Sequence, residues 1–210
     1  RVSSRTRLLL VDHVTSQTAL VMPVASLVRE VQGAGVDVLV DGAHAPGMLP
    51  LALDELGAAY YTGNCHKWLC APKGAAFLHV REDRSVRVRP LVISHGANAL
   101  AGERSRFHLE HDWTGTRDPS AWLAVPAALA AMEAMVPGGW PELQRRNHEL
   151  ALGGRRELCA SLGIEPPCPE DMIGSMAAVP LPDARPAGPV DAFSRSPLQA
   201  ALYREHRIEV

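Results

Sequence analysis

The stretch Thr62-Gly63-Asn64-Cys65-His66-Lys67-Trp68 contains one of only two lysines, Lys67 and Lys73, in a chain with 21 Lys+Arg residues. A lysine amine can lose its proton when it is desolvated and then act as a nucleophile, which a guanidinium essentially cannot do. Taken alone, Lys67 is better explained as a surface or interface lysine. The sequence around it therefore decides its interpretation.

Two strand patterns precede this stretch, and each ends in a polar loop. The apolar run over residues 7–11 predicts a buried strand that ends at Asp12, and residues 36–40 predict a second that ends at Asp41. A third strand, predicted over residues 58–61, leads into Gly63. Amphipathic helices are predicted between them, over residues 23–32 and 51–56. Alternating strands and helices predict an α/β fold with a mainly parallel sheet.

Parallel strands place their carboxyl ends along one edge of a sheet, where open α/β folds bind ligands. The polar loops after the three predicted strands therefore meet at one edge. Thr15, Asp41, His44, His66 and Lys67 lie in these loops and can converge on one pocket.

The pair Asp41 and Lys67 suggests a particular cofactor. A carboxylate at the end of a buried strand is costly unless it pairs with a cation. Pyridoxal phosphate meets both requirements, because its aldehyde forms a Schiff base with a lysine and its protonated ring nitrogen pairs with an aspartate. Alone, Asp41 would be read as a helix cap, and His44 and His66 as polar loop histidines.

Four motifs, in order and at matching spacing, resemble the class V aminotransferase group of fold-type-I pyridoxal-phosphate enzymes. Isopenicillin N epimerase-like and cysteine desulfurase-like members look most similar. The motifs cover most of residues 1–138 and are Asp12-His13-Val14-Thr15-Ser16, residues 40–47 (VDGAHAPG), residues 63–68 (GNCHKW) and Trp113-Thr114-Gly115-Thr116-Arg117-Asp118.

The resemblance implies catalytic roles for three residues. Lys67 would form the Schiff base with the cofactor, and Asp41 would pair with the pyridine nitrogen. His44 would lie beside the ring and orient the phenolic oxygen.

The resemblance also implies cofactor contacts from further residues. Asn64 and His66 would lie near the cofactor phosphate, and Thr15 would line the pocket. In relatives, the Gly-Thr pair that matches Gly115-Thr116 reaches the phosphate of the neighbouring subunit's cofactor, which implies a homodimer with shared active sites.

The rest of the chain predicts a boundary between a cofactor-binding large domain, residues 1–138, and part of a small α+β domain, residues 139–210. Strands are predicted over residues 75–80, 86–93 and 175–181, and residues 94–112 are predicted to be a loop. Helices are predicted over residues 121–136, with Pro126 as a kink or true start, and over residues 140–162 and 197–206; residues 183–197 form a Pro-rich loop.

Composition excludes several classes of function. A formal net charge of −2 without a basic run argues against nucleic-acid binding, and no apolar run approaches the length of a membrane span. The four cysteines form no CxxC pair, so a reducing cytoplasm is expected. His108 and His111 lack a third metal ligand, so no metal site is predicted.

We therefore expect a pyridoxal-phosphate enzyme that acts on an amino acid or a similar amine and is isopenicillin N epimerase-like. Alternatives are a C–S lyase or cysteine desulfurase, or a truncated non-catalytic remnant. The chain has no initiating Met and opens directly into a strand, which suggests an interior segment of a longer protein. The upstream phosphate loop and downstream carboxylate-binding Arg of relatives are not in it.

Overall fold

The computed structural model describes residues 2–100, 102–181 and 197–209. These residues group into two compact units, Arg1–Val179 and Pro180–Val210. The predicted domain boundary between residues 138 and 139 falls inside the first unit. It remains a prediction about the complete protein.

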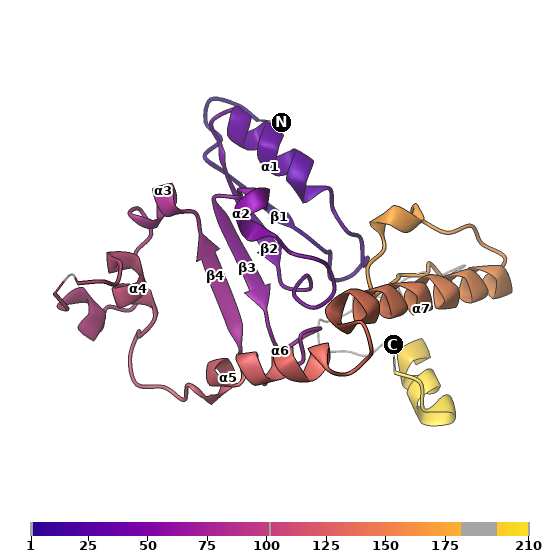
Figure 1. Cartoon of the computed structure of the whole chain (residues 1–210). Coiled ribbons are helices and arrows are strands. Elements are labelled where there is room, and N and C mark those ends of the chain that lie inside the picture. The colour runs from indigo at the N-terminus through magenta and orange to yellow at the C-terminus, as the bar shows by residue number, and fades with distance from the viewer. Residues whose placement is uncertain (1, 101, 182–196, 210) are drawn as a thin grey trace. The chain divides into compact units, whose positions relative to one another are not determined.

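The first unit is built on a four-stranded sheet of order β1-β2-β3-β4 (Figure 1). Strands β1 (Leu8–Asp12), β2 (Asp37–Gly42) and β3 (Tyr60–Asn64) are parallel, and β4 (Ala76–Val80) pairs antiparallel with β3. The register places Asp12 opposite Asp41, and Asp41 opposite Thr62. The prediction of a mainly parallel α/β sheet is confirmed, and the antiparallel edge strand is an addition to it.

One face of the sheet packs on helices α1 (Val24–Gly33) and α2 (Leu53–Leu56) and forms the main core. Val38, Val40 and Tyr61 point to this face and are fully buried. Because side chains alternate along a strand, Asp41 and Thr62 point to the opposite face. That face also carries Leu10 and Leu78, which are 64% and 44% exposed.

The helices of the second half mostly follow the sequence prediction. Helix α6 (Val125–Glu133) has Pro126 in its first turn, where a missing N–H costs nothing. Helix α7 (Gly139–Leu162) begins after Gly138 and ends at Gly163, both with positive φ. The other helical segments of the first unit are short: α3 (Glu82–Ser85), η1 (His95–Ala97), α4 (Arg106–His111), α5 (Ser120–Leu123) and η2 (Glu170–Met172).

Two predicted strands are wrong. Residues 86–93 form no strand, and Val86, Leu91 and Ile93 are exposed. Residues 175–181 form none either; just before them, Ile173 makes an isolated bridge with Leu20. Both segments contain a proline, which lacks the N–H that a ladder needs.

The predicted loop over residues 94–112 was also wrong in part, because it contains η1 and α4. Ser105 caps α4 by accepting a hydrogen bond from the His108 N–H, so a start signal was present.

The second unit contains α8 (Pro197–Ala201) followed by a π-helical turn, η3 (Leu202–His206). This agrees with the predicted last helix. The Pro-rich loop predicted over residues 183–197 lies, apart from Pro197, outside the described residues.

Candidate active site

Two loops at the carboxyl ends of β2 and β3 carry the candidate site. Asp41 is the penultimate residue of β2, His44 lies in the turn that follows, and Lys67 lies in the turn after β3. A Cβ on Gly47 would lie only 2.5 Å from the Trp68 carbonyl carbon, and Gly47 has a φ of +84°. Glycine at position 47 therefore allows the two loops to touch.

Lys67 and His44 are in direct contact. The Lys67 Nζ lies 3.2 Å from the His44 Nε2. Burial lowers the pKa of His44, the charge of Lys67 lowers it further, and Asp41 and Asp12 oppose this. The imidazole is therefore neutral near pH 7 and accepts the lysine's hydrogen bond at Nε2, which leaves its proton on Nδ1.

The remaining hydrogen-bonding groups of the site are not fully used. The His44 Nδ1 is buried without a partner among the described residues. Asp41 is half-buried, and its Oδ1 accepts a hydrogen bond from the Ala43 N–H. No ion pair of the described residues involves Asp41. A ligand with one acceptor and one cationic group would therefore suit these two side chains.

His66 and Asn64 flank Lys67 along the chain. The His66 Nδ1 lies 3.0 Å from the Ala75 carbonyl oxygen, which also accepts the Cys65 N–H at 2.9 Å. This contact ties the Lys67 turn to the start of β4 and holds His66 by its Nδ1. Asn64 is the last residue of β3 and is half-buried. Their predicted proximity to a phosphate remains a prediction.

Thr15 is in the loop after β1, but its hydroxyl serves that loop. It lies 2.6 Å from the Thr18 hydroxyl and accepts the Leu20 N–H at 2.9 Å. Gly115 and Thr116 lie between α4 and α5. A Cβ on Gly115 would meet nothing within 4 Å, and Thr116 is exposed. The structure thus brings together Asp41, His44 and Lys67, whereas it gives no contact of Thr15, Gly115 or Thr116 with them.

Sequence reasoning missed two residues behind this site, His13 and Tyr61. The Tyr61 hydroxyl lies 2.8 Å from the His13 Nδ1. Tyr61 is fully buried at the centre of the core. A histidine directly after a strand and a tyrosine inside one were the available signals, but only the register shows that they meet.

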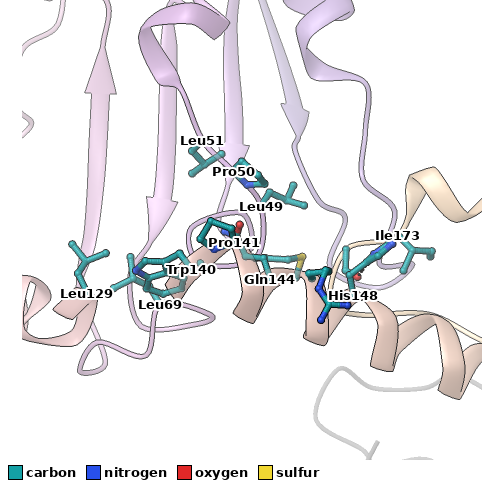
Figure 2. A pocket seen from close by; sticks show the side chains of 14 residues that line it. Leu49, Pro50, Leu51, Leu69, Leu129, Trp140, Pro141, Gln144, His148 and Ile173 are labelled. Atoms are coloured by element: carbon teal, nitrogen blue, oxygen red, sulfur yellow. Dashed lines mark hydrogen bonds between the residues drawn. The ribbon is translucent and has the colours of Figure 1, made fainter. Parts of the chain in front are cut away.

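A separate cavity of about 730 Å³ is lined in part by Gly47 and the residues that follow it. Figure 2 shows side chains of α7, including Pro141, Gln144 and His148, on one wall and Leu49 to Leu51 on the other. Gly47 and Leu69 line it, but Asp41, His44 and Lys67 do not. This cavity therefore shares the Gly47 turn with the candidate site but is not lined by its three side chains.

The model of the class-V aminotransferase family matches residues 1–185. The chain belongs to this family. The predicted family and fold class are thereby confirmed. Class V aminotransferase and cysteine desulfurase relatives depend on pyridoxal phosphate, which is the predicted cofactor.

Curated relatives carry two kinds of name. The chain is 40% identical over 183 residues to the "Probable L-cysteine desulfhydrase, chloroplastic" of Arabidopsis thaliana, covering 85% of this chain and 37% of that protein. It is 40% identical over 191 residues to the isopenicillin N epimerase of Amycolatopsis lactamdurans, covering 85% of this chain and 47% of that protein. The chain thus spans less than half the length of these relatives.

Solved structures agree on the fold. A cysteine desulfurase from Thermococcus onnurineus NA1 superposes with a TM-score of 0.66 at 18% identity, over 80% of this chain and 42% of that one. A protein described as NifS-like gives 0.62 at 20% identity, over 83% of this chain and 43% of that one. At such identities the likeness concerns the fold alone.

The residues present fit the family's cofactor. His44 Nδ1 has no hydrogen-bond partner and the Asp41 carboxylate no ion pair within the described part of the chain, so with the Lys67 amine they supply a donor, an anion and a nucleophile in adjoining loops. These are the groups that would face a phenolic oxygen, a ring nitrogen and an aldehyde. Among the described residues, no helix is long and apolar enough to cross a membrane.

Proposed function

We propose that the complete protein is a pyridoxal-phosphate enzyme that carries its cofactor on Lys67 and acts on an amino acid or a similar amine. The observation that carries this is the 3.2 Å contact between Lys67 and a neutral His44, beside an unpaired Asp41. When bound, the cofactor withdraws electrons from the substrate's α-carbon and weakens the bonds to it. A cytoplasmic location is part of the proposal.

Each of the three side chains has a distinct task. Asp41 keeps a positive charge on the ring nitrogen in place, because an anion favours the protonated form of a neighbouring base. The Lys67 amine would be the group that takes a proton from the substrate's α-carbon and returns it. His44 orients that amine through its Nε2 and offers its Nδ1 proton to the cofactor.

Reduction with borohydride tests the attachment. The full-length protein is incubated with pyridoxal phosphate, reduced and digested, and the peptides are analysed by mass spectrometry. We expect a phosphopyridoxyl group on Lys67 and none after Lys67→Ala; Lys73→Ala is the matched control and should leave labelling intact. Labelling elsewhere, or labelling that survives Lys67→Ala, refutes the proposal and favours a non-catalytic remnant.

We propose an isopenicillin N epimerase-like reaction, and C–S cleavage is the second candidate. The first rests on the GNCHKW motif and on the epimerase relative, and the second on the desulfhydrase-named relative of equal identity. Epimerisation exchanges the α-proton and leaves the carbon skeleton intact, whereas a lyase releases sulfide. Incubation in D₂O separates them: deuterium at the α-carbon of recovered substrate supports the epimerase, and sulfide from L-cysteine supports the lyase.

We also propose a homodimer in which Gly115 and Thr116 reach the partner's cofactor phosphate. Support comes from the exposure of Thr116 and the open space at Gly115. A mixed dimer tests it: one subunit carries Lys67→Ala and the other Thr116→Ala. Shared sites predict that one site per mixed dimer regains normal cofactor binding, whereas separate sites predict that none does.

A further inference from the structure

Tyr61 reaches across the sheet beneath the candidate site. Its ring lies over Gly42 of β2, so closely that a Cβ on Gly42 would lie 2.2 Å from the ring and 2.3 Å from the hydroxyl oxygen. Beyond Gly42, the Tyr61 hydroxyl meets the His13 Nδ1 at 2.8 Å. A single side chain from β3 therefore crosses β2 and is held at the end of β1.

His13 also holds Asp41 directly through its backbone. The His13 N–H donates to the Asp41 carbonyl oxygen at 2.7 Å, and the His13 carbonyl accepts the Met22 N–H at 2.9 Å. The ends of β1 and β2 are thus fastened to β3 by a clamp that consists of His13, Tyr61 and Gly42. Asp41 sits between its two attachments.

The clamp is rigid and electrically neutral. Tyr61 has no exposed surface and stacks on Phe77, with ring centroids 6.3 Å apart and planes 7° apart. Burial lowers the pKa of His13. Burial also raises the pKa of Tyr61, and the negative charge of Asp41 adds to this. Both partners are therefore uncharged near pH 7, so the clamp does not pair with the Asp41 carboxylate.

The direction of the Asp41 side chain depends on the backbone that the clamp holds. Gly42 faces Tyr61, and successive side chains of a strand alternate, so the Asp41 carboxylate points to the opposite face. Its Oδ1 accepts the Ala43 N–H, which is also backbone of this turn. Because Asp41 is half-buried and without an ion pair among the described residues, little else fixes it.

We propose that the His13–Tyr61 hydrogen bond positions the Asp41 carboxylate for the cofactor's ring nitrogen. This inference rests on the proposed function, because it assumes that Asp41 faces that nitrogen. His13 and Tyr61 are positioning residues: they act from the far face of the sheet through Asp41 and Gly42.

The test is Tyr61→Phe in the full-length protein. Phenylalanine keeps the ring and its stacking and removes only the hydroxyl. Loss of one hydrogen bond weakens cofactor binding about fivefold. In addition, the pH midpoint of the absorbance change of the Lys67-linked cofactor shifts upward, because a less well-placed Asp41 holds less positive charge on the ring nitrogen.

Variants at position 13 distinguish a role in positioning the Asp41 carboxylate from a role in the stability of the fold alone. An asparagine amide can replace the Nδ1 as a hydrogen-bond partner, so His13→Asn keeps the wild-type midpoint, whereas His13→Leu moves it as Tyr61→Phe does. Combining Tyr61→Phe with His13→Leu adds no further shift, because both remove the same bond. If Tyr61→Phe does not fold, the two His13 variants carry the test.

The outcomes are distinct for the two proposals. A wild-type protein without a Lys67 adduct overturns the proposed function and this inference with it. A normal adduct whose midpoint and affinity are unchanged in both Tyr61→Phe and His13→Leu overturns the positioning role alone. A lower melting temperature with an unchanged midpoint has the same meaning, because it shows a purely structural bond.

Discussion

At the scale of single residues, the contact between Lys67 and His44 places an acceptor, the His44 Nε2, against the amine and leaves the imidazole proton on Nδ1. A half-buried, neutral imidazole beside an amine removes a competing positive charge and leaves an acceptor in its place. The sequence predicted this grouping, because strand ends in a parallel sheet converge. It could not predict the Nδ1 of His44 as an unpartnered donor, or His13 and Tyr61 as supports, because these depend on side-chain directions.

Removal of the Lys67 charge changes the pKa of His44 only in part. In Lys67→Met the pKa of His44 rises, because one of the two causes that lower it is gone, while Asp41 and Asp12 still raise it against the effect of burial. NMR titration of the imidazole proton measures this, with Lys73→Met as the control that leaves it unchanged. A pKa of His44 that does not rise in Lys67→Met would contradict the influence of the lysine charge on this imidazole.

Gly47 provides a second prediction at this scale. In Gly47→Ala, a Cβ would lie 2.5 to 2.6 Å from backbone atoms of Trp68 and Leu69, at a φ of +84°. The strain and overlap should lower the free energy of unfolding by about 2 kcal/mol or more. Urea unfolding measures it against Gly33→Ala, where nothing lies within 4 Å. Equal midpoints for the two variants would contradict the close loop contact.

At the scale of elements, the sequence predicted the strands of the sheet correctly, but it also predicted strands in segments that pair with nothing in the sheet. Strands β1 to β3 have apolar runs and end in polar loops, and each finds a partner. Residues 86–93 are rich in valine, leucine and isoleucine, yet pairing also needs a free strand edge and unbroken donors, and Pro90 removes one. Propensity describes the segment alone, whereas pairing depends on its surroundings.

Because His13 fastens the strand ends, the free energy of unfolding should depend on the protonation of its imidazole and therefore on pH. The pKa of His13 in the folded chain is below its ordinary value of 6.5. The contribution of His13 to the free energy of unfolding is therefore complete above pH 6.5. It is lost as the pH falls below that value, because the unfolded chain takes up the proton more readily. His13→Asn should flatten this slope in urea unfolding between pH 7.5 and 5. A residual slope is expected from His44, whose pKa is also lowered.

At the scale of the whole first unit, the described helices α1 and α2 cover one face of the sheet, and apolar side chains on the other face are exposed. Sheets with parallel strands are usually buried on both faces. The face that carries Asp41 has Leu10 and Leu78 substantially exposed, and Leu8 is 48% exposed on it as well. The chain spans 37% and 47% of the length of the two curated relatives described above.

This asymmetry predicts opposite outcomes for matched substitutions on the two faces. Leu10→Ser should change the unfolding free energy of the 210-residue chain by less than about 0.5 kcal/mol, because the side chain is 64% exposed. Val40→Ala should cost about 2 kcal/mol, because Val40 is fully buried against α1. Leu10→Ser should also reduce the binding of a hydrophobic dye, since it removes apolar surface from the exposed face.

If Leu10→Ser instead costs as much unfolding free energy as Val40→Ala, and the cost grows with protein concentration, the face is covered by a second copy of the chain. A large cost independent of concentration would show that the chain itself covers this face in solution.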